Sequence, residues 1–296
     1  MDNSVSGSLA IDAFEVRLSD IDTVELDQLH ALSIGVGWPH RAEDWQFLRN
    51  VGRGIAASDQ IGRVLGSAMW FPQGSGFATV GMVITSPRLQ SLGAGELLMR
   101  RILGEQQGCE FRLNATRAAR RLYLSLDFHP ERTVYQCQGE ARRSLRIPAV
   151  PLGPELRRLE ETDLAAIAEL DARAFGVSRR TLLVALFQES VGFGLFRRGQ
   201  LDAFALCRRF GRGHVVGPVA ASRDEDAIAV VAPLVSLHAG HFLRLDTHFR
   251  EAEFGAFLSQ SGLPVFDTVL TMSLGRNFPD LKSQPVTYGL ASQALG

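Results

Sequence analysis

The residues best suited to chemistry lie in a glycine-containing turn at residues 90–95, Gln-Ser-Leu-Gly-Ala-Gly. Residues 83–85 before it are typical of a strand that stops at Pro87, and apolar residues at helical spacing follow it. The first N–H groups of a helix have no partner inside the helix, and the helix dipole adds positive charge there. This turn is therefore expected to bind a diphosphate, although a surface loop that opens a helix would show the same pattern.

The surrounding sequence excludes two common nucleotide sites. Lys282 is the only lysine in the chain, so no lysine follows the glycines as a P-loop requires. A dinucleotide-binding turn is excluded because residues 93–95 lack the third glycine and no acidic residue ends a second strand about 20 residues on. What remains is a strand, a Gln-x-x-Gly-x-Gly turn and a helix.

A second motif follows the turn. Residues 111–116 are typical of a strand with polar residues at its end, and residues 117–126 have the apolar spacing of a helix. This helix carries Leu-Tyr at 122–123 and closes with Leu-Asp-Phe at 126–128. Together the two motifs resemble the GNAT superfamily of N-acetyltransferases, whose members have a similar acyl-CoA turn, a Leu-Tyr pair and a Leu-Gly-Phe helix end. Asp127 stands here in place of the usual glycine.

The resemblance implies roles for these residues. The strand at 83–85 would hydrogen-bond the pantetheine arm of acetyl-CoA through its backbone, and the turn would bind the diphosphate. Tyr123 would protonate the leaving CoA thiolate, because a phenol stays protonated at neutral pH; its alternative is a tyrosine of the core. Asn114 would hold the pantetheine or an ordered water, or would simply end its strand. The expected cofactor-binding residues are Val83, Ile84, Thr85, Gln90, Ser91, Leu92, Gly93, Ala94, Gly95, Glu96, Asn114 and Tyr123.

The acceptor side is less sharply defined. Members of the family often use a Glu or Asp as the base, and the candidates in segments that could face the acceptor are His40, Glu43, Asp44 and Asp246. Each is more typical of a solvated or capping residue than of a base. In the family the early loop and helix form one wall of the acceptor site, and aromatic residues there would suit a flat or cationic molecule. The expected acceptor contacts are Trp38, His40, Trp45, Trp70 and Asp246, with a core position as the alternative for Trp70.

A metal site is the other reading of the histidines. His238 and His241 are three residues apart and would share a helical face, with His248 nearby. No carboxylate or cysteine completes a recognisable spacing, so no metal is expected.

The composition limits the class of protein. The chain has 296 residues, enough for two domains of ordinary size, and a formal net charge of -1. This charge gives no general attraction to nucleic acid or to an anionic membrane, and no apolar run approaches the length of a membrane span. The three cysteines are far apart and odd in number, which favours a reducing compartment. We expect a cytoplasmic monomer or homodimer that binds neither nucleic acid nor membranes.

The pattern restarts after a linker rich in proline and arginine at about 142–154. Residues 158–163 echo 17–22, and 244–247 (Arg-Leu-Asp-Thr) echo 112–115 (Arg-Leu-Asn-Ala). We therefore expect two tandem α/β domains, at 1–141 and 155–296, each a mostly antiparallel mixed sheet flanked by helices. In the second, residues 222–226 (Ser-Arg-Asp-Glu-Asp) replace the glycine turn and Gly255 falls where Tyr123 stands. This half is expected to bind no CoA, and to build the acceptor side or only stabilise the first.

These observations favour an N-acetyltransferase that moves an acetyl group from acetyl-CoA to a primary amine of a small molecule by direct attack. Tandem GNAT proteins with one inactive half, such as mycothiol synthase, are similar in plan. Two alternatives are a non-catalytic acyl-CoA sensor or scaffold, which would have no use for Tyr123, and a protein N-acetyltransferase, which usually needs an open groove.

Overall fold

The computed structural model describes residues 7–11, 14–87, 89–90, 92–143, 153–277 and 285–296. We call residues up to 143 the first half and residues from 153 the second half. The first half contains β1 (Gly7–Ile11), β2 (Phe14–Asp20), α1 (Leu26–Gly35), α2 (Ala42–Val51), β3 (Arg53–Ser58), β4 (Val64–Gln73), β5 (Phe77–Thr85), α3 (Ala94–Glu105), β6 (Glu110–Ala115), α4 (Arg120–Leu124) and β7 (His129–Glu140). The second half contains β8 (Glu155–Arg158), α5 (Leu164–Phe175), α6 (Arg180–Gln188), β9 (Ser190–Arg197), β10 (Gln200–Phe210), β11 (Gly213–Ala221), α7 (Asp224–Leu237), β12 (Phe242–Thr247), α8 (Ala252–Gln260), β13 (Val265–Leu274) and β14 (Val286–Gly289). None of these helices is long and apolar enough to cross a membrane.

The two halves repeat one arrangement. Antiparallel strands lead to a parallel pair, β5 with β6 in the first half and β11 with β12 in the second. These are the parallel pairs among the described strands, so the expected mostly antiparallel mixed sheet, flanked by helices and repeated in tandem, is confirmed. The registers also correspond: Ala78 pairs with Phe111, and His214 pairs with Leu243. The sequence echo between 112–115 and 244–247 therefore reflects equivalent places in the two halves.

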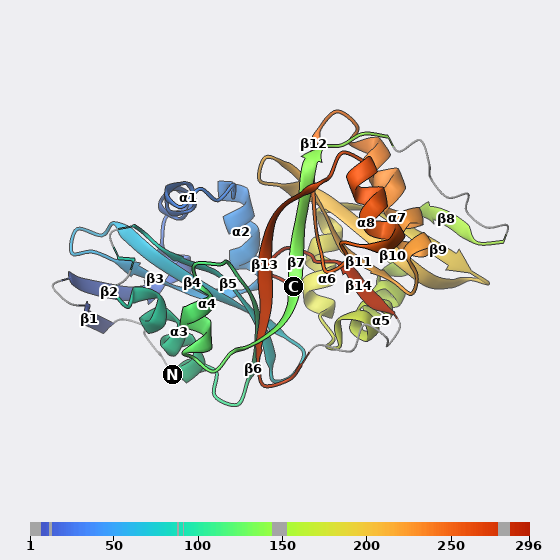
Figure 1. Ribbon diagram of the computed structural model, residues 1–296. Coiled ribbons are helices and arrows are strands. Elements are labelled where there is room, and N and C mark those ends of the chain that lie inside the picture. The colour runs from blue at the N-terminus through green and yellow to red at the C-terminus, as the bar shows by residue number, and fades with distance from the viewer. Residues whose placement is uncertain (1–6, 12–13, 88, 91, 144–152, 278–284) are drawn as a thin grey trace.

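Two strands cross between the halves. From the sequence, residues 133–138 would close the first unit as a strand; the strand is present as β7, but it does not pair with β6. β13 lies between them, antiparallel to both, and β7 pairs on its other side with β12. All strands except β14 therefore follow one another in a single sheet, with β6, β13, β7 and β12 at its centre (Figure 1). The domain limits 1–141 and 155–296 stay a prediction, and most of the expected linker lies outside the described residues.

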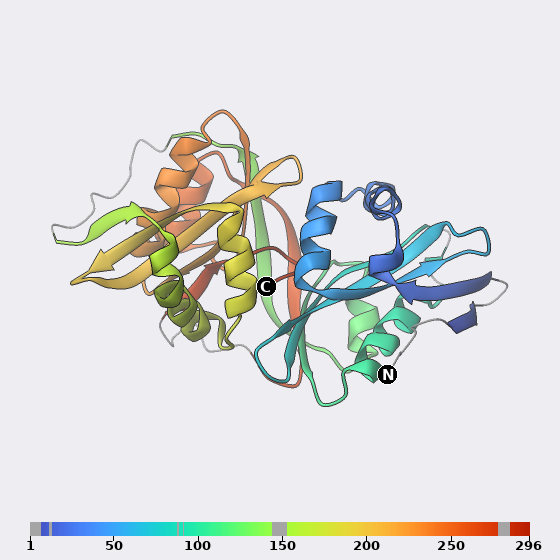
Figure 2. The ribbon, with the colours of Figure 1, turned by 180° about the vertical axis from the view of Figure 1, so that it is seen from behind.

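Buried side chains join the halves as well. Leu29 of α1 and Trp45 of α2 belong to the same core cluster as Ile167 of α5 and Leu186 of α6. Figure 2 shows α2 and α6 facing each other across the junction. Helices α3 and α4 lie on the other face of the first half and cover a separate core. The helix expected at 117–126 is shorter in the structure, where α4 spans Arg120–Leu124.

Candidate active site

The central feature of the site is a gap that opens where β5 and β6 separate. The two strands pair only from Phe77–Glu110 to Val80–Leu113. Beyond that point the β4–β5 register shifts, Met82 adopts a positive φ of 51°, and the Ser67 hydroxyl donates to the Met82 carbonyl at 2.8 Å. Residues 83–85 therefore continue against β4 with their other backbone edge facing the gap. We call this gap the cofactor slot.

The expected phosphate turn lies at one end of the slot. Gly93 adopts a φ of 83°, which favours glycine, and α3 begins directly after it. Within the described part of the chain, the N–H groups of Gly93, Ala94 and Glu96 have no backbone acceptor. The Gln90 side chain donates to the Thr85 carbonyl at 3.2 Å and so ties the turn to β5, whereas Ser91 lies outside the described residues. The backbone is thus arranged as an anion site requires.

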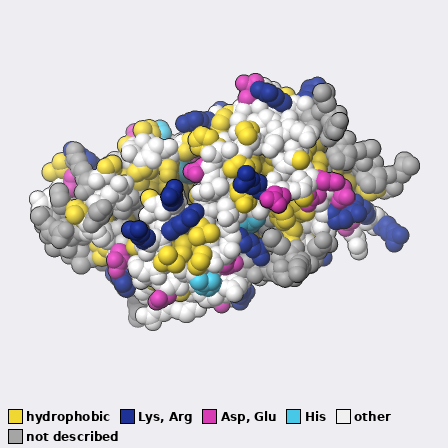
Figure 3. Space-filling model, viewed as in Figure 1, with side chains coloured by type: hydrophobic (Ala, Val, Ile, Leu, Met, Phe, Trp, Pro, Cys, Tyr) yellow, Lys and Arg dark blue, Asp and Glu magenta, His cyan; other side chains and the backbone are white. Residues whose placement is uncertain are grey.

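Basic side chains gather on the face that carries α3 and α4 (Figure 3). Arg100 and Arg101 of α3 are paired with glutamates of the same helix. Arg117 and Arg121, beside and on α4, form no ion pair within the described residues. These two cations give the surface beside α3 a local positive charge.

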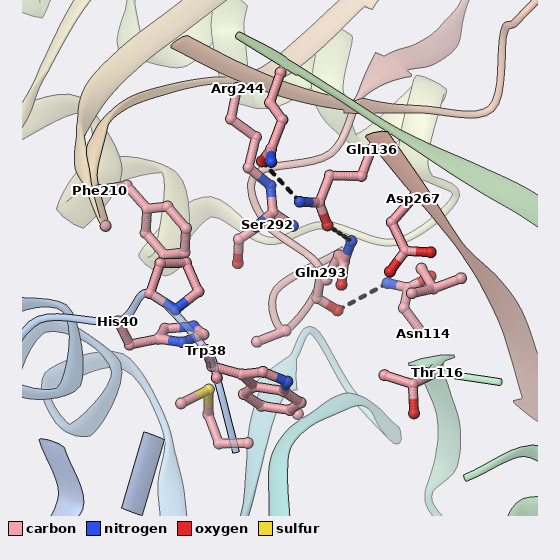
Figure 4. Close-up of a pocket in the computed structure, with 18 of the residues that line it drawn as sticks. Trp38, His40, Asn114, Thr116, Gln136, Phe210, Arg244, Asp267, Ser292 and Gln293 are labelled. Carbon is pink, nitrogen blue, oxygen red and sulfur yellow. Dashed lines mark hydrogen bonds between the residues drawn. The ribbon is translucent and has the colours of Figure 1, made fainter. Parts of the chain in front are cut away.

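A cavity of about 250 Å³ joins the slot to the second half. We call it the junction cavity. Its first-half wall includes Trp38, His40, Val83, Asn114, Thr116 and Tyr123. Its other walls include Gln136 and Gln138 of β7, Phe210 and Arg212 at the β10–β11 turn, Arg244 of β12, Asp267 of β13, and Ser292 and Gln293 near the end of the sequence. Figure 4 shows these side chains converging from both halves.

Tyr123 lines the junction cavity together with Val83 of β5. It is buried on α4 and packs its ring edge-on against Phe128 at 5.9 Å. Burial raises the pKa of its phenol well above the usual value, so the hydroxyl carries its proton at neutral pH. No described residue hydrogen-bonds this hydroxyl.

Asn114 is tied to both halves. Its amide Nδ2 donates to the Gln293 carbonyl at 2.8 Å, and its Oδ1 accepts from the Thr271 hydroxyl of β13 at 2.7 Å. The Gln293 side chain in turn donates to Gln136 at 3.2 Å, and Gln136 donates to Gln138 at 2.8 Å. This row of amides fixes Asn114 against the cavity wall (Figure 4).

Of the expected acceptor contacts, the structure brings Trp38 and His40 to the junction cavity and leaves the other three outside its lining. Trp45 is fully buried in the core, where its indole donates to the Ser33 hydroxyl at 2.7 Å. Trp70 is 5% exposed within β4. Asp246 is fully buried and accepts from Arg244 at 2.8 Å, so Arg244 is the member of this pair that reaches the cavity.

Of the four candidate bases, only His40 lines the junction cavity, and Glu43, Asp44 and Asp246 lie outside its lining. Burial opposes ionisation of Asp44, but hydrogen bonds from Arg41 and Gly211 outweigh it and hold the pKa of the carboxyl below its usual value. Asp44 thus caps α2 and fastens it to the β10–β11 turn at 2.9 Å. Glu43 is exposed outside the cavity lining. His40 lines the cavity, and burial, aided by Arg244 and Arg208, lowers its pKa to about 4.

Sequence reasoning missed the walls contributed by crossing strands and by residues 290–296. Gln136, Asp267 and Gln293 carry no motif, and only the pairing of β13 between β6 and β7 brings them beside Asn114. Arg244 was visible in the sequence as the equivalent of Arg112, but not as a cavity residue. Among the described residues there is no group of three or more His, Cys, Asp or Glu side chains that could hold a metal.

Comparisons with known proteins agree with this geometry. A model of the GNAT acetyltransferase family matches residues 24–128, and a model of a GNAT acetyltransferase domain matches residues 167–286. A search of curated protein sequences gives no match.

Similar solved structures are all distant in sequence. One, named only as a candidate acetyltransferase from Pyrococcus horikoshii, is 18% identical with a TM-score of 0.76 and covers 97% of this chain and 98% of its own. A tandem GNAT protein of the clavulanic acid biosynthesis pathway is 14% identical, with a TM-score of 0.61 and coverage of 92% and 99%. A GCN5-related glucosamine N-acetyltransferase region of a fungal multi-domain enzyme is 15% identical, with a TM-score of 0.64, and covers 90% of this chain but 39% of that one. At these identities the likeness establishes the fold.

Proposed function

The chain belongs to the GNAT superfamily of acyltransferases in its tandem form, and from this premise we propose that it transfers an acetyl group from acetyl-CoA to a primary amine of a small molecule. The reaction is direct: the amine nitrogen attacks the thioester carbonyl, a C–N bond forms, and the C–S bond breaks. The proposed site is the cofactor slot together with the junction cavity.

The observation that carries this proposal is the early end of the β5–β6 pairing at Val80 and Leu113. It leaves the outer backbone edge of residues 83–85 open to an extended ligand, which would bind there as an added strand does. A pantetheine arm is such a ligand. Its diphosphate would then meet the N–H groups of Gly93 and its neighbours, and its thioester would enter the cavity near Val83 and Tyr123.

Tyr123 is proposed as the acid of the reaction. As the tetrahedral intermediate collapses, negative charge develops on the CoA sulfur, and the protonated phenol donates first a hydrogen bond and then its proton to it. The high pKa of the phenol ensures that it is protonated before each turnover. The proton lost by the amine leaves through solvent or through a base that the proposal does not assign.

The walls of the cavity favour a small acceptor. Residues of both halves surround the space beyond the slot, and Gly81 contacts the 290–296 segment so closely that an added Cβ would lie 2.5 Å from the Cβ of Ala294. A peptide chain would have to pass these contacts, whereas a small amine would not. A cytoplasmic location and a monomeric or homodimeric state stay predictions.

The test compares Tyr123→Phe with Tyr135→Phe, a tyrosine of β7 outside the cavity lining. CoA release is first screened over small amines, including glucosamine and amino acids, and the best acceptor is used for both variants. We expect Tyr123→Phe to lower kcat about 100-fold or more, with the Kd of acetyl-CoA from calorimetry unchanged, and Tyr135→Phe to keep its kcat. Equal turnover of Tyr123→Phe and the parent protein would remove Tyr123 from this role.

A further inference from the structure

The guanidinium of Arg244 presents an unused edge to the junction cavity. Its Nε and Nη2 donate to the Asp246 carboxylate at 3.0 and 2.8 Å, and its side chain is 9% exposed. Its Nη1 makes no hydrogen bond to any residue that the structure describes, and Arg244 is part of the cavity wall. Asp246 is fully buried, so it holds the guanidinium in a fixed orientation.

A guanidinium held in this way can bind one further planar anion. It carries five N–H groups, of which the Asp246 carboxylate engages those on Nε and one side of Nη2. The remaining edge matches two oxygens of a carboxylate in a bidentate pair. An open donor edge on a nearly buried side chain is costly unless a ligand or water completes it.

The surrounding charges favour an anion on this side of the cavity. Arg208 lies beneath the Phe210 ring at 5.2 Å without an ion pair to a described carboxylate, and burial lowers its pKa to about 10, so it stays charged. Arg212, exposed at the cavity rim, also has no ion pair in the described part of the chain. His40 adds no charge at neutral pH, since its pKa is about 4. Asp246 neutralises only Arg244.

The opposite side of the cavity carries the complementary charge. Asp267 of β13 and Arg244 of β12 lie on opposite sides of β7, because β7 pairs with β13 along one edge, where Asp267 faces Gln136, and with β12 along the other (Figure 4). Asp267 is exposed, and its carboxylate accepts only the adjacent Thr268 N–H among the described groups. Asp267 lines the same cavity as Val83 and Tyr123, so its carboxylate attracts an ammonium group into that cavity.

We propose that the acceptor is a small amine that also carries a carboxylate, with the carboxylate on the free edge of Arg244 and the amine directed toward Asp267 and the slot. This proposal rests on the proposed function and names its substrate class. Arg244 is a specificity-determining residue in it, and Asp267 a positioning residue.

The experiment measures kcat/KM for β-alanine and γ-aminobutyrate, for the corresponding amides, and for n-propylamine and n-butylamine. We expect each acid to exceed its amide and its alkylamine by about tenfold or more, since only the acid completes a charge-assisted bidentate pair. Equal rates for acids and amides would overturn the proposal. If acetyl-CoA binds but no amine of any kind releases CoA, the proposed function fails instead.

The variant that tests the residue is Arg244→Lys, which keeps a cation for Asp246 but loses the planar fork. The preference for acids over amides should fall about tenfold or more through KM, while the rates with the amides stay near those of the parent protein. Arg209→Lys, an exposed arginine outside the cavity lining, is the matched control. Should Arg244→Lys fail to fold, the double variant Arg244→Gln/Asp246→Asn removes both buried charges and makes the same prediction. An equal loss with acids and amides would assign Arg244 a structural role only.

Discussion

The two halves contain equivalent slots, and only one is open. β11 separates from β12 after Val215 and Arg244, just as β5 separates from β6. In the second half, however, β14 pairs with β11 along residues 219–221, the equivalents of 83–85. The N–H of Leu290 then donates to the Asp246 carbonyl at 2.9 Å. The chain itself lies where the proposed pantetheine arm would lie in the first half.

The helix that follows each slot differs in the same sense. α3 begins after Gly93 with backbone N–H groups that have no described acceptor, whereas α7 begins with Asp224, Glu225 and Asp226. The Asp224 carboxylate accepts from the Tyr288 hydroxyl of β14 at 2.8 Å and from the Phe254 N–H at 2.9 Å. A carboxylate and a strand of the protein thus take the places that a diphosphate and its arm would take.

This difference indicates that the two halves of the duplicated fold have different roles. A slot that is filled by the chain cannot bind a cofactor, but it makes the second half rigid enough to supply a wall. That wall contributes Arg244 and Phe210 to the junction cavity. The comparison supports a single cofactor site, and it can be tested by making the first slot resemble the second.

The largest expected effect comes from placing a carboxylate at the start of α3. Gly93→Asp adds a negative charge beside the proposed diphosphate, at a position where an added Cβ meets no atom within 4 Å. At about 4 Å and an effective dielectric constant of about 20, each charge pair costs about 4 kcal/mol, so the Kd of acetyl-CoA should rise about 100-fold or more.

The matched control for this change is Gly93→Asn, which has the same shape and the same backbone strain at positive φ but no charge. Calorimetric titration with acetyl-CoA should show at most a few-fold change for this variant. If the aspartate and asparagine variants bind acetyl-CoA equally well, the diphosphate does not lie at this turn.

A smaller effect follows from the histidines. Ala78, in the paired part of β5, corresponds to His214 in the paired part of β11. Burial, and then the nearby His238 ring at 4.0 Å, lower the His214 pKa to about 4. Burial also lowers the pKa values of His40 and His248 to about 4. In the unfolded chain these histidines titrate near 6.5, so between about pH 6.5 and 4 the unfolded state binds more protons than the folded state. The free energy of unfolding therefore decreases as the pH is lowered through this range.

Urea unfolding at several pH values measures this loss, which we expect to reach about 2 kcal/mol at pH 4.5 after allowance for solvent. His214→Asn, in the second half, and His40→Asn, at the junction cavity, should each weaken the dependence of the free energy of unfolding on pH. A free energy of unfolding that is constant between pH 6.5 and 4.5 would contradict the assignment of these histidines as neutral.

Much of the fold was predictable from local signals, including the strand, turn and helix that form the proposed cofactor site. The glycines of 90–95 and the polar end of 111–116 are adjacent in sequence to the elements that they terminate. The similarity of residues 112–115 to residues 244–247 predicted the duplication. In the structure these residues lie at corresponding positions of β6 and β12, each paired in parallel with the preceding strand of its half.

The acceptor side was not predictable from such signals. The alternation of apolar and polar residues along β7 and β6 is the same whether they pair with each other or both pair with β13, since both arrangements bury the same faces. The sequence pattern therefore does not predict which strand pairs with which. Asp267 and Gln136 reach the cavity only through that exchange. Trp45 was expected at the acceptor wall from the family analogy, but the structure buries it with Leu48 of α2 in the core that joins the two halves.

The smallest expected effect tests whether the filled slot is a structural element separate from the open one. Tyr288→Phe removes one donor to Asp224 but leaves the Phe254 N–H bond and the stacking of the ring on Phe249 at 4.3 Å. The loss of one hydrogen bond to a partly buried carboxylate should lower the free energy of unfolding by about 1 kcal/mol, measured in urea at pH 7, with Tyr135→Phe as the control for losing a phenol hydroxyl. The Kd of acetyl-CoA should not change, because no atom of the first slot is touched. A parallel loss of acetyl-CoA affinity would mean that the strand filling one slot also sets the geometry of the other, and the two halves would then have to be treated as a single binding unit.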